Sequence, residues 1–332
     1  MSRARRILLA AAAAVAALAA SAGTVAVLLH QPGPPLPAPV MVSVGEGRRF
    51  RDVAQDLAAR GVLRHPLLLV LWARVTGRDR AVRWGDYRIG APLTPLELLA
   101  RLEGPPDPVQ AVTIPEGLTV DEVVSLLALH GYGAEESFHC LLDDPAFLAA
   151  EELPAEGAEG YLFPDTYVLP LATPPERILH TMLERFRAVF TPEMEKKAAA
   201  LGLDRQQAVT LASLVEEETA RPEERRLVAA VFLNRLRRGM PMQSDPTVLY
   251  GRAPGDRRIT RADLRRPTPH NTYTIRGLPP TPIANPGRAA LEAAVDPAPV
   301  RHLYFVARGD GSHEFSDDFG AHQAAVARWQ RR

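Results

Sequence analysis

Three consecutive acidic residues, Glu216 to Glu218, close a stretch whose apolar residues recur at helical spacing. On a helical projection Leu211 and Leu214 share one face, and Glu218 falls on that same face. Glu217 points away from this face, and Glu216 lies at its margin. A carboxyl group on an apolar face is costly to ionise, so burial would raise its pKa toward neutrality. The spacing therefore favours Glu218 as a general acid, with a frayed acidic helix end or a buried ion pair as the alternative.

The sequence lacks the motifs of several other catalytic classes. It contains no His-Glu-x-x-His pattern for zinc, no Gly-x-Ser-x-Gly elbow and no phosphate-binding Gly-x-x-x-x-Gly-Lys loop. The histidines are scattered without ligand spacing, and Cys140 is the single cysteine, so an intramolecular disulfide is impossible. We therefore predict no metal and no cofactor, and a site centred on a carboxyl group.

A helix after this stretch offers an amide close to the acid. Pro222 suits the first turn of a helix that runs to about Arg238, with Gly239 as its stop. On that helix Val231 and Asn234 share an apolar stripe. An amide in such a stripe must be hydrogen-bonded, so Asn234 either holds the acid or a ligand, or simply bonds backbone groups.

Two later segments, 243–251 and 271–287, are dense in amides, hydroxyl groups, aromatic residues, proline and glycine. Amides bond hydroxyl groups, and aromatic rings stack on the faces of sugars. The two segments therefore favour a groove for a sugar polymer. The alternative is a loop-rich shell that packs on the helices.

The N-terminus has the pattern of a membrane segment. Three arginines, at positions 3, 5 and 6, precede an uncharged run of 23 residues from Ile7 to Leu29, and about 20 residues suffice to cross a bilayer. Positive charge before the run predicts a cytoplasmic N-terminus and an exported body. Ala20 to Ala22 would also suit cleavage of a signal peptide, but the apolar run continues beyond it, which favours an anchor. Residues 30–39 contain five prolines and predict a stiff tether.

The chain repeats itself after the tether, at an offset of 70 residues: Val42–Val53 can be laid over Val112–Val123. The copies share a glutamate–glycine pair, Glu46-Gly47 in the first and Glu116-Gly117 in the second. Each copy predicts a short strand, a glycine turn and an amphipathic helix, and the alternative is two unrelated segments of this common type. We expect closing strands at 85–87 and 159–161, which gives two small βααβ units.

The remaining chain predicts helices at 177–189, 192–201 and 205–219, a hairpin over 303–315 and a final helix at 321–330. The fold class is therefore α+β, with an N-terminal transmembrane helix, two βααβ units and a mixed helix and sheet domain. The expected boundaries are 1–29 for the anchor, 30–39 for the tether, 40–104 and 110–170 for the two units, and 175–332 for the last domain. Basic and acidic side chains balance at 39 each, so nothing indicates a nucleic-acid partner.

The chain resembles the endolytic murein transglycosylase family, the MltG-type or YceG-like proteins. The resemblance is carried by Gly160–Tyr167, Leu211–Ala220, Val231–Leu236, Gln243–Gly251, Asn271–Gly287 and Leu303–Val306. It implies an inner-membrane protein with a cytoplasmic N-terminus, an extracytoplasmic LysM-like module in the first unit and a catalytic domain. The catalytic glutamate of the family maps onto Glu218. Glu217 stands where many members have lysine, and we expect little effect because that position faces solvent.

The resemblance also implies the reaction. It would be cleavage of the β-1,4 bond after N-acetylmuramic acid within peptidoglycan strands, leaving 1,6-anhydro ends, with Glu218 as acid and then base. The partners would be glycan strands, the membrane and the cell-wall synthesis machinery. The substrate-binding residues expected in the groove are Asn234, Gln243, Asp245, Tyr250, Asn271, Tyr273 and Asn285. Glu216 and Asp165 are secondary candidates.

Two alternatives stay open. Asp245 or Asp165 could act as the second acid of a muramidase, because ordinary glycosidases use two carboxyl groups. Asp165 could instead join Tyr167 in bracing the joint between the second unit and the catalytic domain. The other alternative is an anchored scaffold that binds peptidoglycan without cleaving it.

Overall fold

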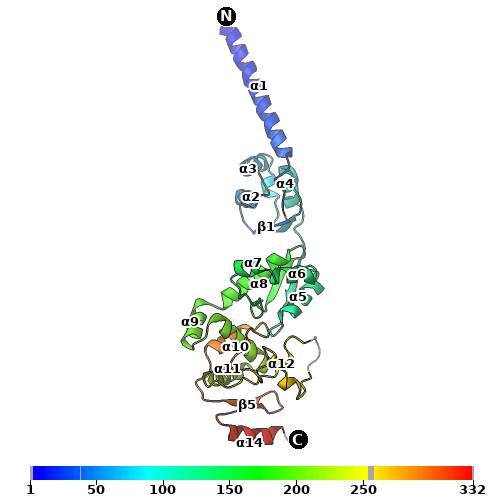
Figure 1. Ribbon diagram of the computed structural model, residues 1–332. Helices are drawn as coiled ribbons and strands as arrows, with labels where there is room; N and C mark the ends of the chain where they lie inside the picture. The colour runs from blue at the N-terminus through cyan, green and yellow to red at the C-terminus, as the bar shows by residue number, and fades with distance from the viewer. Residues whose placement is uncertain (1–2, 38, 253–257, 331–332) are drawn as a thin grey trace. The chain divides into compact units, whose positions relative to one another are not determined.

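The computed structural model describes residues 3–37, 39–252 and 258–330 (Figure 1). The first two residues of the predicted anchor, residue 38 of the predicted tether and the last two residues of the chain lie outside the described residues. The chain forms two compact units. One contains the chain up to Gln110 together with Leu169–Pro174, and the other contains Ala111–Val168 together with the chain from Pro175.

The first unit begins with helix α1, Arg3–His30. Within the part of the chain that the structure describes, no helix combines the length and the apolar character that crossing a membrane requires. After α1 come β1 (Val40–Val44), α2 (Phe50–Ala59), α3 (Pro66–Val75), the 3-10 turn η1 (Arg78–Arg80), β2 (Gly85–Ile89) and α4 (Pro95–Glu103). The predicted βααβ order is therefore confirmed in the first copy.

Strands β1 and β2 of the first unit pair antiparallel, with Val42 opposite Tyr87. Both side chains are fully buried, as are Leu57 of α2, Leu69 of α3 and Leu98 of α4. Helix α2 packs against α3 (Figure 1). The alternating strand places every second side chain in this core, which is why so short a repeat can fold around two strands.

The second copy of the repeat is larger than predicted. Between β3 (Val109–Thr113) and β4 (Thr166–Pro170), which pair with each other, lie α5 (Val120–Leu129), α6 (Glu135–Leu142) and α7 (Pro145–Ala150). The closing strand expected at 159–161 is wrong, since these residues form a turn. Gly160 has a φ of 89°, and an extended strand cannot continue through that left-handed backbone conformation.

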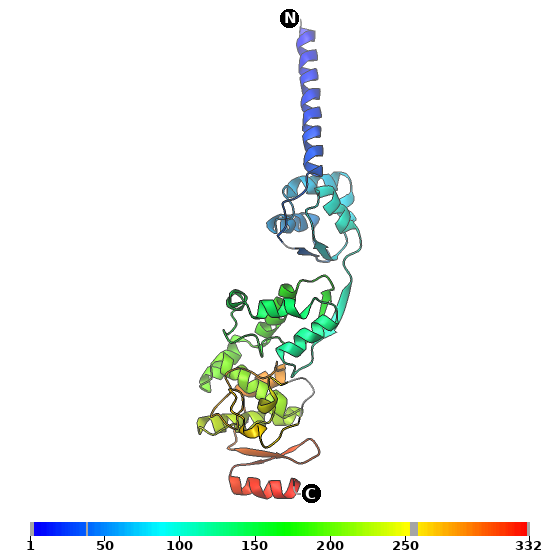
Figure 2. The same ribbon diagram turned by 45° about the vertical axis from the view of Figure 1, so that its right-hand side comes forward.

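The rest of the second unit is mostly helical. It contains α8 (Pro175–Val189), α9 (Pro192–Ala200), α10 (Arg205–Glu218), α11 (Pro222–Arg237), α12 (Pro246–Leu249), the 3-10 turn η2 (Asp263–Arg265), α13 (Arg288–Val295), β5 (Tyr304–Ala307), β6 (His313–Ser316) and α14 (Phe319–Trp329). The hairpin and α14 lie side by side, orange to red in Figure 2. The predicted helices and hairpin are confirmed, whereas α12 and α13 were not predicted.

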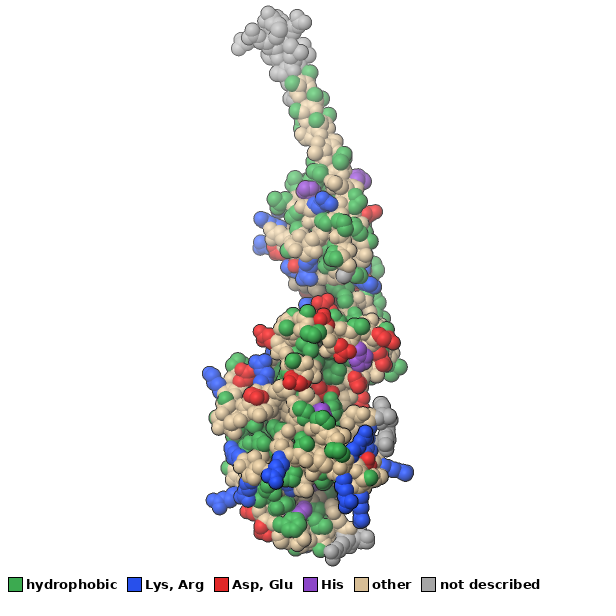
Figure 3. All heavy atoms as spheres, in the orientation of Figure 1, with side chains coloured by type: hydrophobic (Ala, Val, Ile, Leu, Met, Phe, Trp, Pro, Cys, Tyr) green, Lys and Arg blue, Asp and Glu red, His purple; other side chains and the backbone are tan. Residues whose placement is uncertain are grey.

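Helix α10 packs against α11 and α13, and its residues from Ala208 to Val215 are all buried. A capping box between Asp204 and Gln207 fixes its first turn. The helix ends at Glu218, because Thr219 leaves the helical region with a φ of −147°. In the view of Figure 3, basic, acidic and apolar side chains are interspersed on the surface.

Candidate active site

Glu218 is the last residue of α10, and its side chain is half-buried. Its Oε1 accepts a hydrogen bond of 2.5 Å from Oγ of Ser244, which is itself 1% exposed. Among the residues that the structure describes, Ser244 is the only one that donates to this carboxyl group, so Oε2 has no protein donor. One oxygen is thus fixed by the protein, and the other is left to carry a proton.

Two threonines hold Ser244 in place. The Ser244 N–H donates to Oγ1 of Thr272 at 2.9 Å, and Oγ1 of Thr247 donates to the Ser244 carbonyl at 2.6 Å. The two threonine hydroxyl groups contact each other at 2.8 Å. All three side chains are 1% exposed or less. A buried network whose members are all bonded is rigid, so the serine hydroxyl is presented to Glu218 in one position.

A buried arginine fixes the loop that precedes Ser244. Arg235 is 7% exposed and donates to the carbonyls of Leu303 and Met242, each at 2.7 Å. It also donates to Oε1 of Gln243 at 3.3 Å. Gln243 has a positive φ of 53°, a strained conformation for a residue with a side chain. The arginine therefore helps to stabilise a backbone that would otherwise relax.

Asp245 and Tyr273 complete the surroundings of Glu218. The Tyr273 hydroxyl donates to Oδ1 of Asp245 at 2.6 Å. Burial raises the pKa of Tyr273, and the nearby Asp245 and Glu218 carboxyl groups raise it further, so the phenol stays a neutral donor. Of the sequence-predicted residues, Asp245 and Tyr273 thus lie close to Glu218. Gln243 directly precedes Ser244, and its side chain bonds Arg235.

Any reaction that needs Glu218 as a proton donor is expected to slow above pH 7. Burial raises the pKa of Glu218 to about 7, the charges of Asp245 and Glu217 act in the same direction, and the Ser244 hydrogen bond and Arg235 oppose them. A general acid works only while protonated, so kcat should fall about tenfold per pH unit above this pKa. A pH–rate profile shows this directly, and a fall that begins near the ordinary carboxyl pKa of about 4.3 would contradict it.

Two predicted amides bond the backbone of their own surroundings. The Asn234 side chain donates to the carbonyls of Val300 and His302, each at 3.0 Å. Asn271 is 1% exposed, and its side chain donates to the carbonyl of Arg266 at 2.7 Å. Both amides therefore order loops in this structure, and a contact of either with a sugar stays a prediction.

The other two predicted residues meet at Glu159. The Tyr250 hydroxyl donates to Oε2 of Glu159 at 3.1 Å, and Nδ2 of Asn285 contacts Oε1 at 3.4 Å. Asn285 is fully buried, and its amide also bonds the N–H of Leu162 and the carbonyl of Leu118. Tyr250 and Asn285 are thus brought together around a second carboxyl group that the sequence interpretation left out of the site.

The secondary candidates both form ion pairs. Glu216 has a side chain only 7% exposed, and it accepts hydrogen bonds from Arg225 at 3.2 Å and from the N–H of Gly287 at 2.9 Å. Asp165 accepts from Nε of Arg185 at 2.6 Å. Burial alone would raise the pKa of Asp165, but its hydrogen bonds and Arg185 bring the pKa below its ordinary value. Neither carboxyl group contacts Glu218.

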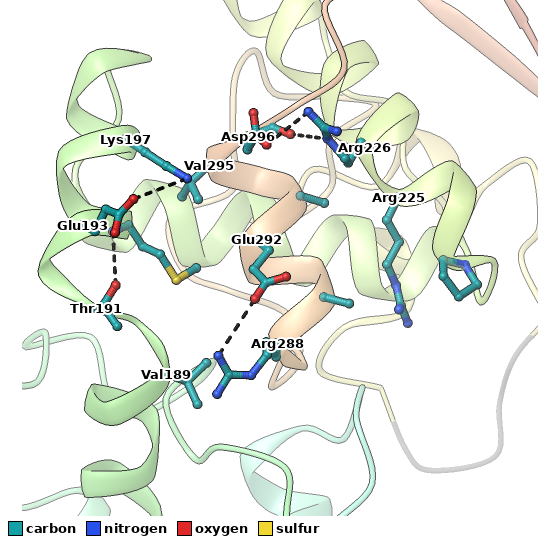
Figure 4. Close-up of a pocket in the computed structure, with 14 residues that line it drawn as sticks. Val189, Thr191, Glu193, Lys197, Arg225, Arg226, Arg288, Glu292, Val295 and Asp296 are labelled. Atoms are coloured by element: carbon teal, nitrogen blue, oxygen red, sulfur yellow. Dashed lines mark hydrogen bonds and ion pairs between the residues drawn. The ribbon is translucent and has the colours of Figure 1, made fainter.

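A cavity of about 440 Å³ lies elsewhere in this unit, among α9, α11 and α13 (Figure 4). None of the residues around Glu218 lines it. Its charged side chains are largely paired with one another: Arg226 with Asp296 at 3.1 Å, and Lys197 with Glu193 and Arg288 with Glu292 at 3.9 Å. The cavity is therefore a weaker candidate than the Glu218 cluster. Among the described residues, no group of three or more histidine, cysteine, aspartate or glutamate side chains is placed to hold a metal ion.

The sequence interpretation missed Ser244, Arg235 and Glu159. Each of the first two lies within a stretch that it singled out, and Glu159 directly precedes another. The available signal was the polar type of each residue, which needs a partner wherever the fold buries it. What the spacing did not contain was the identity of that partner.

The sequence model of the YceG-like family matches residues 42–328. Two proteins named endolytic murein transglycosylase are similar to this chain. The one from Streptococcus pneumoniae is 30% identical over 299 residues, which is 81% of this chain and 54% of that protein. The one from Bacillus subtilis is 32% identical over 238 residues, which is 66% of this chain and 64% of that protein. The chain thus spans 54% to 64% of the length of these relatives.

A similar fold is known from a crystal structure of a yceG-like protein from Listeria monocytogenes. The two folds superpose with a TM-score of 0.58 and a sequence identity of 24%, over 86% of this chain and 98% of that one. This likeness concerns the fold alone.

Proposed function

This chain belongs to the YceG-like family, and we propose that it is an endolytic murein transglycosylase that cleaves peptidoglycan strands internally. The observation that carries the proposal is the half-buried carboxyl group of Glu218, which Ser244 holds by one oxygen and whose pKa is raised to about 7 by its burial. It lies inside the region that matches the family, among polar side chains suited to a sugar substrate.

In the proposed reaction, protonated Glu218 first acts as the acid. Its Oε2 donates a proton to the glycosidic oxygen between N-acetylmuramic acid and N-acetylglucosamine, and the C1–O bond breaks as positive charge develops on C1. The new carboxylate then accepts the proton of the muramyl 6-hydroxyl group, whose oxygen bonds to C1 and closes the 1,6-anhydro ring. The proton returns to Glu218 and no water is consumed, so one carboxyl group suffices where hydrolysis needs two.

The neighbours of Glu218 support both steps. The Ser244 hydrogen bond and the nearby charge of Arg235 stabilise the carboxylate once its proton has left. We propose that Asp245 and Tyr273, which lie close to the acid, and Gln243, which directly precedes Ser244, contact the glycan. Asn234, Tyr250, Asn271 and Asn285 bond protein groups, so we propose that they order the loops that form the groove.

We also propose that the protein works outside the cytoplasm, held at the plasma membrane by its N-terminal segment. The uncharged run from Ile7 to Leu29 and the arginines before it support this orientation. Extraction of membranes at alkaline pH, together with N-terminal sequencing of the mature protein, distinguishes a retained anchor from a cleaved signal peptide. Release of a shortened protein would exclude the anchor.

The test of the proposed function is mass spectrometry of uncrosslinked glycan strands after digestion. The wild type is expected to cut long strands internally and to leave shorter strands with anhydromuramyl ends. Reducing ends would show a hydrolase instead. Asp245→Asn is the decisive companion variant. If one acid suffices, this variant keeps cleavage. The alkaline fall of its pH–rate profile moves to lower pH, because the Asp245 charge that raises the pKa of Glu218 is removed. Loss of all cleavage in this variant, with strand binding unchanged, would favour a two-acid mechanism. Wild-type protein that binds strands without cleaving them would favour the scaffold.

A further inference from the structure

We propose that Glu159 is a positioning residue for this site, tying together the two segments that hold the catalytic end of α10. Its expected effect on kcat rests on the proposed function, whereas its expected effect on the pKa of Glu218 does not. Glu159 does not contact Glu218, and it lies in the turn before the second closing strand, between α7 and β4.

Three donors from different parts of the unit converge on the Glu159 carboxyl group. The N–H of Val120, at the start of α5, lies 3.1 Å from Oε1 and 3.3 Å from Oε2. The Tyr250 hydroxyl lies 3.1 Å from Oε2, and Nδ2 of Asn285 lies 3.4 Å from Oε1. An acceptor-only carboxylate is the side chain that can satisfy all of them at once.

The first route from Glu159 to the acid runs through Tyr250. Tyr250 follows the last residue of α12, and the segment from Ser244 to Tyr250 contains that helix. The Thr272 contacts fix the Ser244 end of this segment, and the bond to Glu159 fixes its other end. Holding both ends keeps the Ser244 hydroxyl 2.5 Å from Glu218.

The second route runs through Asn285. Its backbone carbonyl accepts from the N–H of Gly117, and two residues later the N–H of Gly287 donates to Oε2 of Glu216 at 2.9 Å. Glu216 belongs to the last turn of α10, two residues before Glu218. The segment 244–250 therefore bonds Glu218 and the segment 285–287 bonds Glu216, both in the last turn of α10.

Burial and the charges around Glu159 make its hydrogen bonds to Val120, Tyr250 and Asn285 depend on its protonation state. Burial raises the pKa of Glu159 to about 7, and the charge of Asp121 on α5 adds to the effect, while the bonds from Val120 and Tyr250 lower it. The ring of His270 lies 4.5 Å from that of Tyr250, tilted by 47°, and burial lowers the pKa of this histidine. The donors converge on the ionised form, so the tie is strongest above pH 7 and weakens as Glu159 takes up a proton.

The experiment measures the pKa of Glu218 and the kinetics in Glu159→Leu and Tyr250→Phe. Tyr250→Phe is the milder change, because it removes one hydrogen bond and leaves the Val120 and Asn285 contacts intact. Tyr167→Phe is its matched control, since the Tyr167 hydroxyl bonds the carbonyl of Phe163 at 2.6 Å in the same unit. Carboxyl ¹³C NMR titration, with the Glu218 signal identified by its absence in Glu218→Gln, reports the pKa without requiring activity.

Loosening the segment weakens the Ser244 bond that lowers the pKa of Glu218. We therefore expect that pKa to rise in Glu159→Leu, Tyr250→Phe and Ser244→Ala, and to stay unchanged in Tyr167→Phe. For Tyr250→Phe, kcat should fall about five- to tenfold with little change in KM. The double variant Glu159→Leu/Tyr250→Phe should be no slower than Glu159→Leu, because the two share one hydrogen bond.

An unchanged pKa of Glu218 in folded Tyr250→Phe and Glu159→Leu would overturn the proposal. So would additive losses in the double variant, or an equal effect from Tyr167→Phe. If Glu159→Leu does not fold, Tyr250→Phe decides alone. If the wild type makes no anhydromuramyl ends, the proposed function fails. The NMR titration still tests whether the hydrogen bonds of Glu159 affect the pKa of Glu218.

Discussion

Replacing Glu218 by glutamine is expected to lower kcat for glycan cleavage by about 10² to 10⁴-fold, the contribution typical of a general acid. The amide has nearly the shape of the carboxyl group, and its oxygen can still accept the hydrogen bond from Ser244. It carries no acidic proton for the glycosidic oxygen, and it cannot accept the proton of the 6-hydroxyl group. Digestion of glycan strands followed by quantitation of anhydromuramyl ends measures the loss.

Glu217→Gln is the matched control, because it changes the exposed neighbour of Glu218 in the same helical turn. It should keep activity within about threefold, with its alkaline limb at slightly lower pH, since the Glu217 charge raises the pKa of Glu218. Equal losses in the two variants would mean that the helix end, and not the acid, had been damaged. Full activity of Glu218→Gln would remove Glu218 from the mechanism altogether.

Stability provides an independent check on the same carboxyl group. Its pKa in the folded chain, about 7, is above the ordinary value, so between those two values the native state keeps a proton that the unfolded chain loses. Raising the pH through this window therefore destabilises the wild type, and the effect is complete above pH 7. Glutamine cannot ionise, so Glu218→Gln should be at least as stable as the wild type at pH 8. A less stable variant at that pH would argue against a raised pKa.

Helical spacing was sufficient to distinguish the three adjacent acids. Glu217 is exposed, and Glu218 lies in the polar cluster with a raised pKa, as its phase on α10 predicts. The buried ion pair that the sequence offered as an alternative for Glu218 occurs instead at Glu216, which pairs with Arg225. The spacing placed Glu216 only at the margin of the apolar face, so it did not indicate how deeply that residue would be buried.

The partners of Glu218 could not be predicted in this way. Ser244 is 26 residues away in the sequence, and its position depends on a loop without regular periodicity, which two threonines and Arg235 hold. Helix α13 was missed for another reason: its 8 residues form little more than two turns, too few for a helical period to be recognised. The closing strand was misplaced because the match of Glu159 to Tyr161 with the first copy rested on residue types and ignored the backbone conformation of Gly160.

Gly160 gives the largest stability effect that we expect. Its φ of 89° is unfavourable for any L side chain, and a Cβ atom would lie 2.6 Å from Cγ of Pro282 and 2.8 Å from Cγ1 of Val209. The proline ring cannot rotate away, so α10 or the loop at Pro282 would have to move. Gly160→Ala is therefore expected to destabilise the second unit by roughly 3 kcal/mol or more, combining left-handed backbone strain of about 1–2 kcal/mol with an overpacking cost of similar size.

Gly131→Ala separates the two causes in that sum. Gly131 has a φ of 83°, close to that of Gly160, but nothing lies within 4 Å of its added Cβ atom. Its substitution should cost only the backbone term, about 1–2 kcal/mol, and denaturant unfolding of both variants measures the difference. Equal costs would mean that the Pro282 loop yields easily. A much larger cost for Gly160→Ala would show that the turn before β4 is packed rigidly against α10. Since Glu159 precedes this glycine directly, that rigidity is what would allow its carboxyl group to hold Tyr250 and Asn285 in place.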